Sequence, residues 1–187
     1  MKIKLHEIYA QLEAWRAERK ITAESQRQGY IRNVMEELGE LAVGLRDYDS
    51  WSKCDLRFCQ IHKEMAERVI VDAICDISVL TINAGADIAP NEIETRNNWS
   101  LSFLLACINY FETSNFVAYA DDVLICCASL CEKYGFNFEI AMLETIKEIS
   151  SRTGSYNEAT KKWEKDTSDE AQAKWYQADY ELARIKK

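Results

Sequence analysis

The chain has 187 residues, of which 48% are hydrophobic, and its formal net charge is −8. That length suits one compact domain, and the apolar fraction excludes an intrinsically disordered chain. The acidic excess gives no general attraction for phosphates or anionic lipid, which disfavours a nucleic-acid polymer or a membrane as partner. With one proline and six glycines, the chain has too few turn residues for a β-sandwich, so we expect an all-α fold.

Apolar residues at spacings of three and four predict a first helix over residues 3–19. The same pattern is clearer from 30 to 46, and the polar stretch 46–53 after it is interpreted as a loop. A third helix is expected from about 60 to 84, ended by Gly85.

Three more helices are expected in the second half of the chain, at about 97–112, 116–133 and 138–152. Gly135 is a plausible C-cap for the second of these, and Asn137 a plausible N-cap for the third. The composition then becomes richer in charged and aromatic residues, and Ser168 followed by two acids predicts the start of a last helix. We therefore expect one all-α domain over 1–165 and a helical tail over 166–187, which packs on the domain or on a neighbouring subunit.

Seven cysteines do not indicate a disulfide framework, because the number is odd and the N-terminus has no signal-peptide character. Five of them lie in apolar runs, where a free cysteine behaves as a small hydrophobe. A reducing cytoplasm is the expected location. Cys54, Cys59 and His62 are the only cluster with zinc-ligand chemistry, and their spacing makes zinc a minor alternative.

Two groups of carboxylates stand out on the expected second and third helices. Glu36, Glu37 and Glu40 form an EExxE motif, in which Glu37 and Glu40 lie about 60° apart around the helix. Asp72 and Asp76 share one face of the third helix and interrupt a run that is otherwise almost wholly apolar. Because an unpaired buried carboxylate costs several kcal/mol, we expect these acids to face one another across the helix pair and hold a cation. The alternative is a solvent-facing strip or pairing with distant arginines.

An oxygen-only ligand set suits Mg²⁺, or else Mn²⁺. A di-iron bundle needs Glu-x-x-His pairs, and neither histidine has a glutamate three positions before it. Because bound Mg²⁺ usually recruits substrate phosphates, basic side chains are expected nearby. Candidates cluster in the last third of the chain, including Arg152, Lys162 and Lys165, although an ordinary solvated surface would contain the same residues. No P-loop motif is present.

The carboxylate pattern resembles the all-α nucleoside triphosphate pyrophosphohydrolases, the MazG-like superfamily that includes the dimeric dUTPases. Their signature is EExxE on one helix and ExxD on the next. Glu36-Glu37-Leu-Gly-Glu40 matches the first half and Asp76 matches the final acid. The glutamate position of the second half is Ala73, with an acid one residue earlier at Asp72. The helix that begins near Asp122 is an alternative second motif helix, but position 119 there is not a glutamate.

The resemblance implies an α-helical bundle with the metal site between two core helices, and hydrolysis of a nucleoside triphosphate to the monophosphate and pyrophosphate. By similarity, Glu37, Glu40, Asp72 and Asp76 would hold Mg²⁺, and Glu36 or Glu37 would activate the attacking water. Arg152, Lys162 and Lys165 would bind the phosphate chain, and Asn83 and Trp99 are candidates for contact with the base. Family members are usually homodimers or homotetramers.

Two other functions stay open at this point. A non-enzymatic helical interaction or regulatory protein would use the acids only as a solvated face, and would show no metal affinity. A related phosphohydrolase acting on phosphoribosyl-ATP or an alarmone would keep the same site and differ in its substrate.

Overall fold

The computed structural model describes residues 2–85, 92–96, 100–160 and 162–186, without the side chain of Lys162. The described chain is mostly helical, as predicted. Its main helices are α1 (His6–Glu18), α2 (Ala23–Trp51), α3 (Arg57–Ala84), α4 (Leu101–Thr113), α5 (Ala120–Lys133) and α6 (Phe138–Ser151). Two short antiparallel sheets pair β1 (Lys2–Lys4) with β2 (Glu92–Glu94), and β3 (Gly154–Asn157) with β4 (Lys162–Lys165). The chain ends with the four-residue helix α7 (Asp169–Gln172) and the 3₁₀ helix η1 (Tyr180–Ala183).

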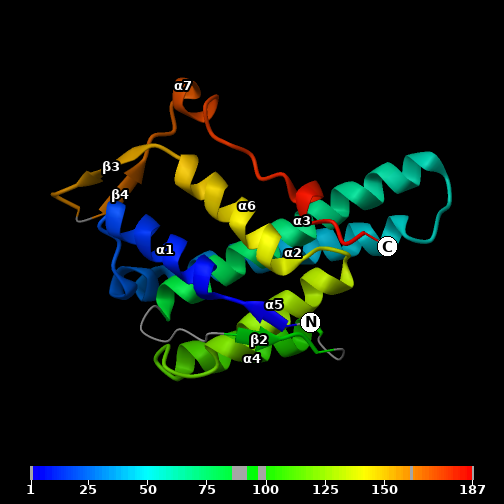
Figure 1. Ribbon diagram of the computed structural model, residues 1–187, viewed down its shortest axis with the longest axis horizontal. Helices are drawn as coiled ribbons and strands as arrows, with labels where there is room; N and C mark the ends of the chain where they lie inside the picture. The colour runs from blue at the N-terminus through cyan, green and yellow to red at the C-terminus, as the bar shows by residue number, and fades with distance from the viewer. Residues whose placement is uncertain (1, 86–91, 97–99, 161, 187) are drawn as a thin grey trace.

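The core is built around α3, whose second half is almost completely buried. It packs along α2 as a long antiparallel hairpin and also contacts α1, α5 and α6. In Figure 1, α1 and α6 lie on one side of this hairpin, and α4 and α5 lie on the other. An all-round apolar helix needs neighbours on every face, so the central place of α3 follows from its sequence.

The second helix is longer at both ends than the sequence pattern indicated. It begins at Ala23, where the Thr22 side chain caps the helix by accepting a hydrogen bond from the Ser25 amide. It continues to Trp51, so the loop predicted over residues 46–53 is wrong for most of its length. Tyr48 explains the extension, because its ring packs edge-on against Tyr134, 4.9 Å between centroids, and holds this polar stretch against the core.

The fifth helix begins later than predicted, at Ala120 instead of near residue 116. The backbone at Asn115, Phe116 and Tyr119 has positive φ, which an L-residue in a helix does not adopt. The Phe116 ring is buried in edge contacts with Tyr30 and Phe111. We attribute the non-helical backbone to this burial. The Gly135 and Asn137 caps are both confirmed: Gly135 has φ +87°, and the Asn137 side chain accepts from the Ile140 amide.

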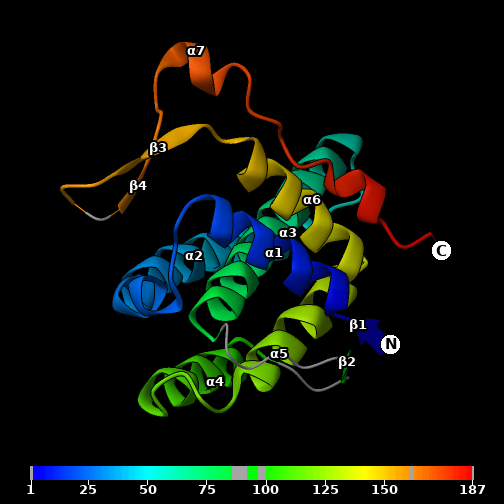
Figure 2. The same ribbon diagram turned by 60° about the vertical axis from the view of Figure 1, so that its left-hand side comes forward.

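After α6 the chain leaves the bundle and then returns to it (Figure 2). The β3–β4 hairpin and α7 extend from the side opposite α4 and α5. Residues 175–185, here named the C-terminal strap, then run back along α6 and include η1. The strap backbone is anchored by hydrogen bonds from the Asn137 amide to the Ala183 carbonyl and from the Ile185 amide to the Gly135 carbonyl.

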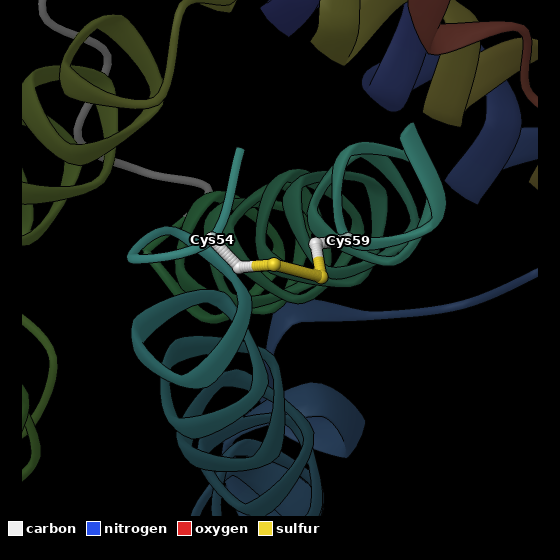
Figure 3. Close-up of a disulfide and its surroundings, with 2 residues drawn as sticks. All are labelled: Cys54 and Cys59. Atoms are coloured by element: carbon white, nitrogen blue, oxygen red, sulfur yellow. A yellow bond between two sulfur atoms is a disulfide. The ribbon is translucent and has the colours of Figure 1, made fainter. Parts of the chain in front are cut away.

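A disulfide joins Cys54, in the turn between α2 and α3, to Cys59 in the first turn of α3 (Figure 3). The expectation that all cysteines are reduced thiols is therefore wrong for this pair. The turn brings the two Cα atoms to 5.9 Å, which suits a disulfide, so neither sulfur is left as a thiolate ligand for zinc. The remaining five cysteines are free and buried, as predicted. Among the described residues, no helix is long and apolar enough to cross a membrane.

Candidate active site

The EExxE motif lies in the middle of α2, on the helix that packs along α3. Leu38 is buried in the core beside it, which fixes the rotation of α2. Glu36 and Glu40 are consequently exposed, and Glu37 lies half-buried at the edge of the apolar stripe. The motif therefore presents one carboxylate towards the helix interface and two towards solvent.

Asp72 and Asp76 lie one turn apart on α3, each partly buried among residues that are fully buried. Burial, reinforced by the neighbouring charges of Asp72 and Glu37, raises the pKa of Asp76 to about 8. Burial likewise raises the pKa of Asp72, and the charges of Glu148 and Glu40 add to the effect. These two carboxyl groups are held where ionisation is unfavourable.

The carboxylates of α2 and α3 interact electrostatically with one another. Burial raises the pKa of Glu37 to about 7, and the charges of Glu40, Asp72 and Glu36 raise it further. The fold thus gathers the acids of both helices in one region, here named the acidic cluster: Glu37, Glu40, Asp72 and Asp76. Within the described residues, Glu37 and Asp76 have neither a hydrogen-bond nor an ion-pair partner.

Glu148 in the last turn of α6 and Arg152, the residue after the helix, border the acidic cluster. The charge of Arg152 opposes the raised pKa of Glu37, Asp72 and Asp76. Its guanidinium pairs with Glu148, with 2.7 Å between Nη2 and Oε1. The Nε of Arg152 is buried, as is the indole nitrogen of Trp175, and neither has a hydrogen-bond partner in the described part of the chain. Within the described residues, two buried hydrogen-bond donors without acceptors therefore lie beside acids whose charge is not neutralised.

The C-terminal strap supplies donors to the carboxylates around the cluster. The Tyr180 hydroxyl donates to Asp72 Oδ1 at 2.6 Å, and the Ala178 amide donates to Glu148 Oε2 at 2.8 Å. Glu144, one turn before Glu148, accepts from the Tyr176 hydroxyl and the Asp179 amide. Neither Glu148 nor Tyr180 was predicted from the sequence as a site residue. The spacing of Glu148 four residues before Arg152 was a usable signal for the first, whereas nothing local indicated the second.

Other predicted site residues lie elsewhere. Asn83 is fully buried, and its side-chain oxygen accepts a 2.7 Å hydrogen bond from Arg16, which ties α3 to α1. Lys165 is exposed on β4 and lines a shallow pocket at the base of the β3–β4 hairpin, and none of the acidic cluster lines this pocket. Its Nζ lies 5.8 Å from the centre of the Trp175 ring, which Arg152 also approaches. Trp99 and the Lys162 side chain are outside the described residues.

The acids are near one another without forming a finished coordination shell. Over residues 2–85, 92–96, 100–160 and 162–186, no group of three or more His, Cys, Asp or Glu side chains is arranged to hold a metal ion. The donor chemistry nevertheless fits Mg²⁺, because all donors are carboxylate oxygens, and a cation would relieve their mutual repulsion. Glu36 and Glu40 are exposed, so their side chains are free to rotate towards a metal.

Similarity to known proteins gives no information about the function, so the evidence for it is the chemical environment of these acids. No protein-family model, curated protein or solved structure matches this chain.

Proposed function

We propose that the protein is a Mg²⁺-dependent nucleoside triphosphate pyrophosphohydrolase of the MazG-like type. The observation that carries the proposal is the pair of acids Glu37 and Asp76, whose pKa values are raised to about 7 and about 8 between two packed helices. Acids held in this way are typical of functional sites, where an ion or substrate supplies the missing charge. A fold without such a ligand gains nothing from keeping them.

In this proposal Glu37, Glu40, Asp72 and Asp76 hold the metal, with Mn²⁺ as a substitute. When bound, the metal neutralises charge on the triphosphate and positions it for in-line displacement. Glu36 or Glu37 accepts the proton of the attacking water, whose oxygen forms a bond to the α-phosphorus. The bond from the α-phosphorus to the bridging oxygen breaks, and pyrophosphate leaves with that oxygen.

The phosphate chain would lie towards the end of α6. Arg152 has a buried Nε that finds no hydrogen-bond partner among the described residues, lies close to the acids, and is the cation best placed to take a phosphate oxygen. Lys165 is on β4 of the β3–β4 hairpin and, like Arg152, lies 5.8 Å from the centre of the Trp175 ring. Lys162 is at the start of the same strand. We leave Asn83 out of the proposed site, because its side chain is already used in the core.

We also propose that the active form is a homodimer or a homotetramer. Large apolar side chains on α3 remain exposed at spacings of three and four, namely Phe58, Ile61, Met65 and Val69. The same stripe continues along α3 to Asp72 and Asp76, so a second copy seated on it would lie beside the acidic cluster. A contiguous apolar face of this kind is unusual on a monomer.

The decisive experiment measures pyrophosphate release from a panel of NTPs and dNTPs, with Mg²⁺ and with EDTA. Phosphoribosyl-ATP and an alarmone belong in the panel, because a related phosphohydrolase would act on them instead. Glu37→Gln should lower the Mg²⁺-dependent rate by about 10²–10⁴-fold if Glu37 is the general base. Glu24→Gln, an exposed glutamate on the same helix, is the matched control and should retain full activity.

If no member of the panel is hydrolysed and Mg²⁺ leaves the melting temperature unchanged, the proposal is wrong. The non-enzymatic helical interaction protein would then be the better hypothesis.

A further inference from the structure

The C-terminal strap reaches one of the proposed metal ligands directly. Tyr180 lies in η1, 108 residues after Asp72, yet its hydroxyl donates to Asp72 Oδ1 at 2.6 Å. The Tyr180 side chain is only 7% exposed, so this hydrogen bond is shielded from water. When Asp72 is ionised, as a metal ligand must be, a hydrogen bond to it in such surroundings is short and strong.

The position of the Tyr180 hydroxyl is itself fixed from a third element. Thr145 on α6 is buried, and its Oγ1 lies 2.9 Å from the Tyr180 hydroxyl. The same Oγ1 lies 3.0 Å from the Ala141 carbonyl of its own helix. Because the Tyr180 proton goes to Asp72, the single Thr145 proton is donated either to Tyr180 or to Ala141. The hydroxyl is therefore held between α6 and α3, and only one of the two oxygens of Asp72 is engaged by it.

We propose that Tyr180 is a positioning residue for Asp72: it holds one carboxylate oxygen so that the other is aimed at the metal. This inference rests on the proposed function, since it gives a role in metal binding to a residue outside the ligand set. Partners of this kind orient metal ligands, and their loss typically lowers metal affinity or activity by about 10–100-fold.

The strap provides its own control for this proposal. Tyr176 also uses its hydroxyl to bind an α6 glutamate, Glu144, which is not a proposed ligand. Tyr176→Phe and Tyr180→Phe each remove one phenolic hydroxyl from the strap, and each should lower stability to a similar extent. Only Tyr180→Phe removes a bond to Asp72.

The experiment measures Mn²⁺ binding by electron paramagnetic resonance and the Mg²⁺ concentration that gives half-maximal pyrophosphate release, on the full chain. We expect Tyr180→Phe to weaken Mn²⁺ binding and raise the Mg²⁺ half-saturation about tenfold or more, with the nucleotide KM at saturating Mg²⁺ much less changed. Tyr176→Phe should leave both metal measurements as in the wild type. Thr145→Val, which loosens the hydroxyl without removing it, should shift them in the same direction by less.

A double-mutant cycle shows whether the effect passes through Asp72. In an Asp72→Asn background, Tyr180→Phe should add no further loss of Mn²⁺ binding. Equal metal affinities for Tyr176→Phe and Tyr180→Phe, in an enzyme that hydrolyses triphosphates, would refute the positioning role alone. If Tyr180→Phe does not fold, an unchanged half-saturation in Thr145→Val has the same meaning. A wild-type protein that binds no Mn²⁺ refutes the proposed function and the positioning role together.

Discussion

Replacing Asp76 by asparagine should make the metal-free protein more stable at pH 8, although it removes a proposed ligand. The pKa of Asp76 is about 8 in the fold, against about 3.9 for an ordinary aspartate. The folded protein therefore holds the proton more tightly than the unfolded chain. As the pH rises through this window, the unfolded chain ionises freely and the folded protein loses stability.

The expected loss of stability follows from the interval between the pKa of Asp76 in the unfolded chain and its pKa in the fold. Between pH 5 and pH 8 the wild type should lose up to about 4 kcal/mol through this one group, at about 1.4 kcal/mol per pH unit. Charge shared with Glu37 and Asp72, which both raise the Asp76 pKa, spreads this loss over several groups. We therefore expect the free energy of unfolding of Asp76→Asn to rise by about 2–4 kcal/mol relative to that of the wild type between pH 5 and pH 8.

The assay is urea unfolding in EDTA at both pH values. Glu13→Gln, an exposed glutamate on α1, is the control, and its stability relative to the wild type should not depend on pH. Adding Mg²⁺ at pH 8 should stabilise the wild type and leave Asp76→Asn unchanged. If Asp76→Asn is destabilised more at pH 8 than at pH 5, the carboxylate makes favourable structural contacts and the reasoning is refuted.

Two further predictions concern the α2–α3 hairpin. A Cβ at Gly44 would lie 2.9 Å from Ile70 Cγ1, so Gly44→Ala should cost about 1–3 kcal/mol in urea unfolding. A Cβ at Gly39 meets nothing within 4 Å, so Gly39→Ala should increase the stability by about 1 kcal/mol. If Gly44→Ala were instead the more stable of the two variants, the close approach of the two helices at Gly44 would be contradicted. If the exposed stripe on α3 is a subunit interface, Met65→Glu should reduce the molar mass measured by light scattering to that of a monomer. A wild type that is already monomeric would refute the oligomer.

The sequence predicted the helices well where local signals and packing agree. The end of α3 at Ala84, before Gly85, and the caps at Gly135 and Asn137 were all readable from residue type and spacing. The predictions failed where a distant contact overrides the local pattern. Phe116 is drawn into an aromatic cluster with residues of α2 and α4, and Tyr48 keeps a polar stretch helical.

The short strands were missed for the same reason. β1 pairs with β2, ninety positions along the chain, through only three residues on each side. Strands this short carry too little alternation to be distinguished from loops. The Cys54–Cys59 disulfide was missed because cysteine count and the expected compartment outweighed the short separation of the two residues, and the compartment itself stays a prediction.

The candidate site divides in the same way between local and distant information. Helix periodicity was enough to predict that Asp72 and Asp76, at i and i+4, share one face of their helix. It also predicted that Glu37 lies at the edge of the apolar face of the preceding helix. Glu148 lies on α6 and Tyr180 on the C-terminal strap, and no local sequence pattern predicts how these two segments pack against α3. The prediction of the acids therefore needed only the helices, whereas the groups that compensate them needed the tertiary structure.

The division between compensated and uncompensated acids is the most informative feature of the structure. The strap gives hydrogen-bond donors to Glu144, Glu148 and one oxygen of Asp72. It gives none to Glu37 or Asp76, and within the described residues nothing else does. A fold that needed only to bury these helices would favour apolar residues at both positions, because each unpaired acid costs free energy. The described part of the protein thus supplies donors to the surrounding acids but not to Glu37 and Asp76, and these two acids are the ones for which the proposed function requires an external cation.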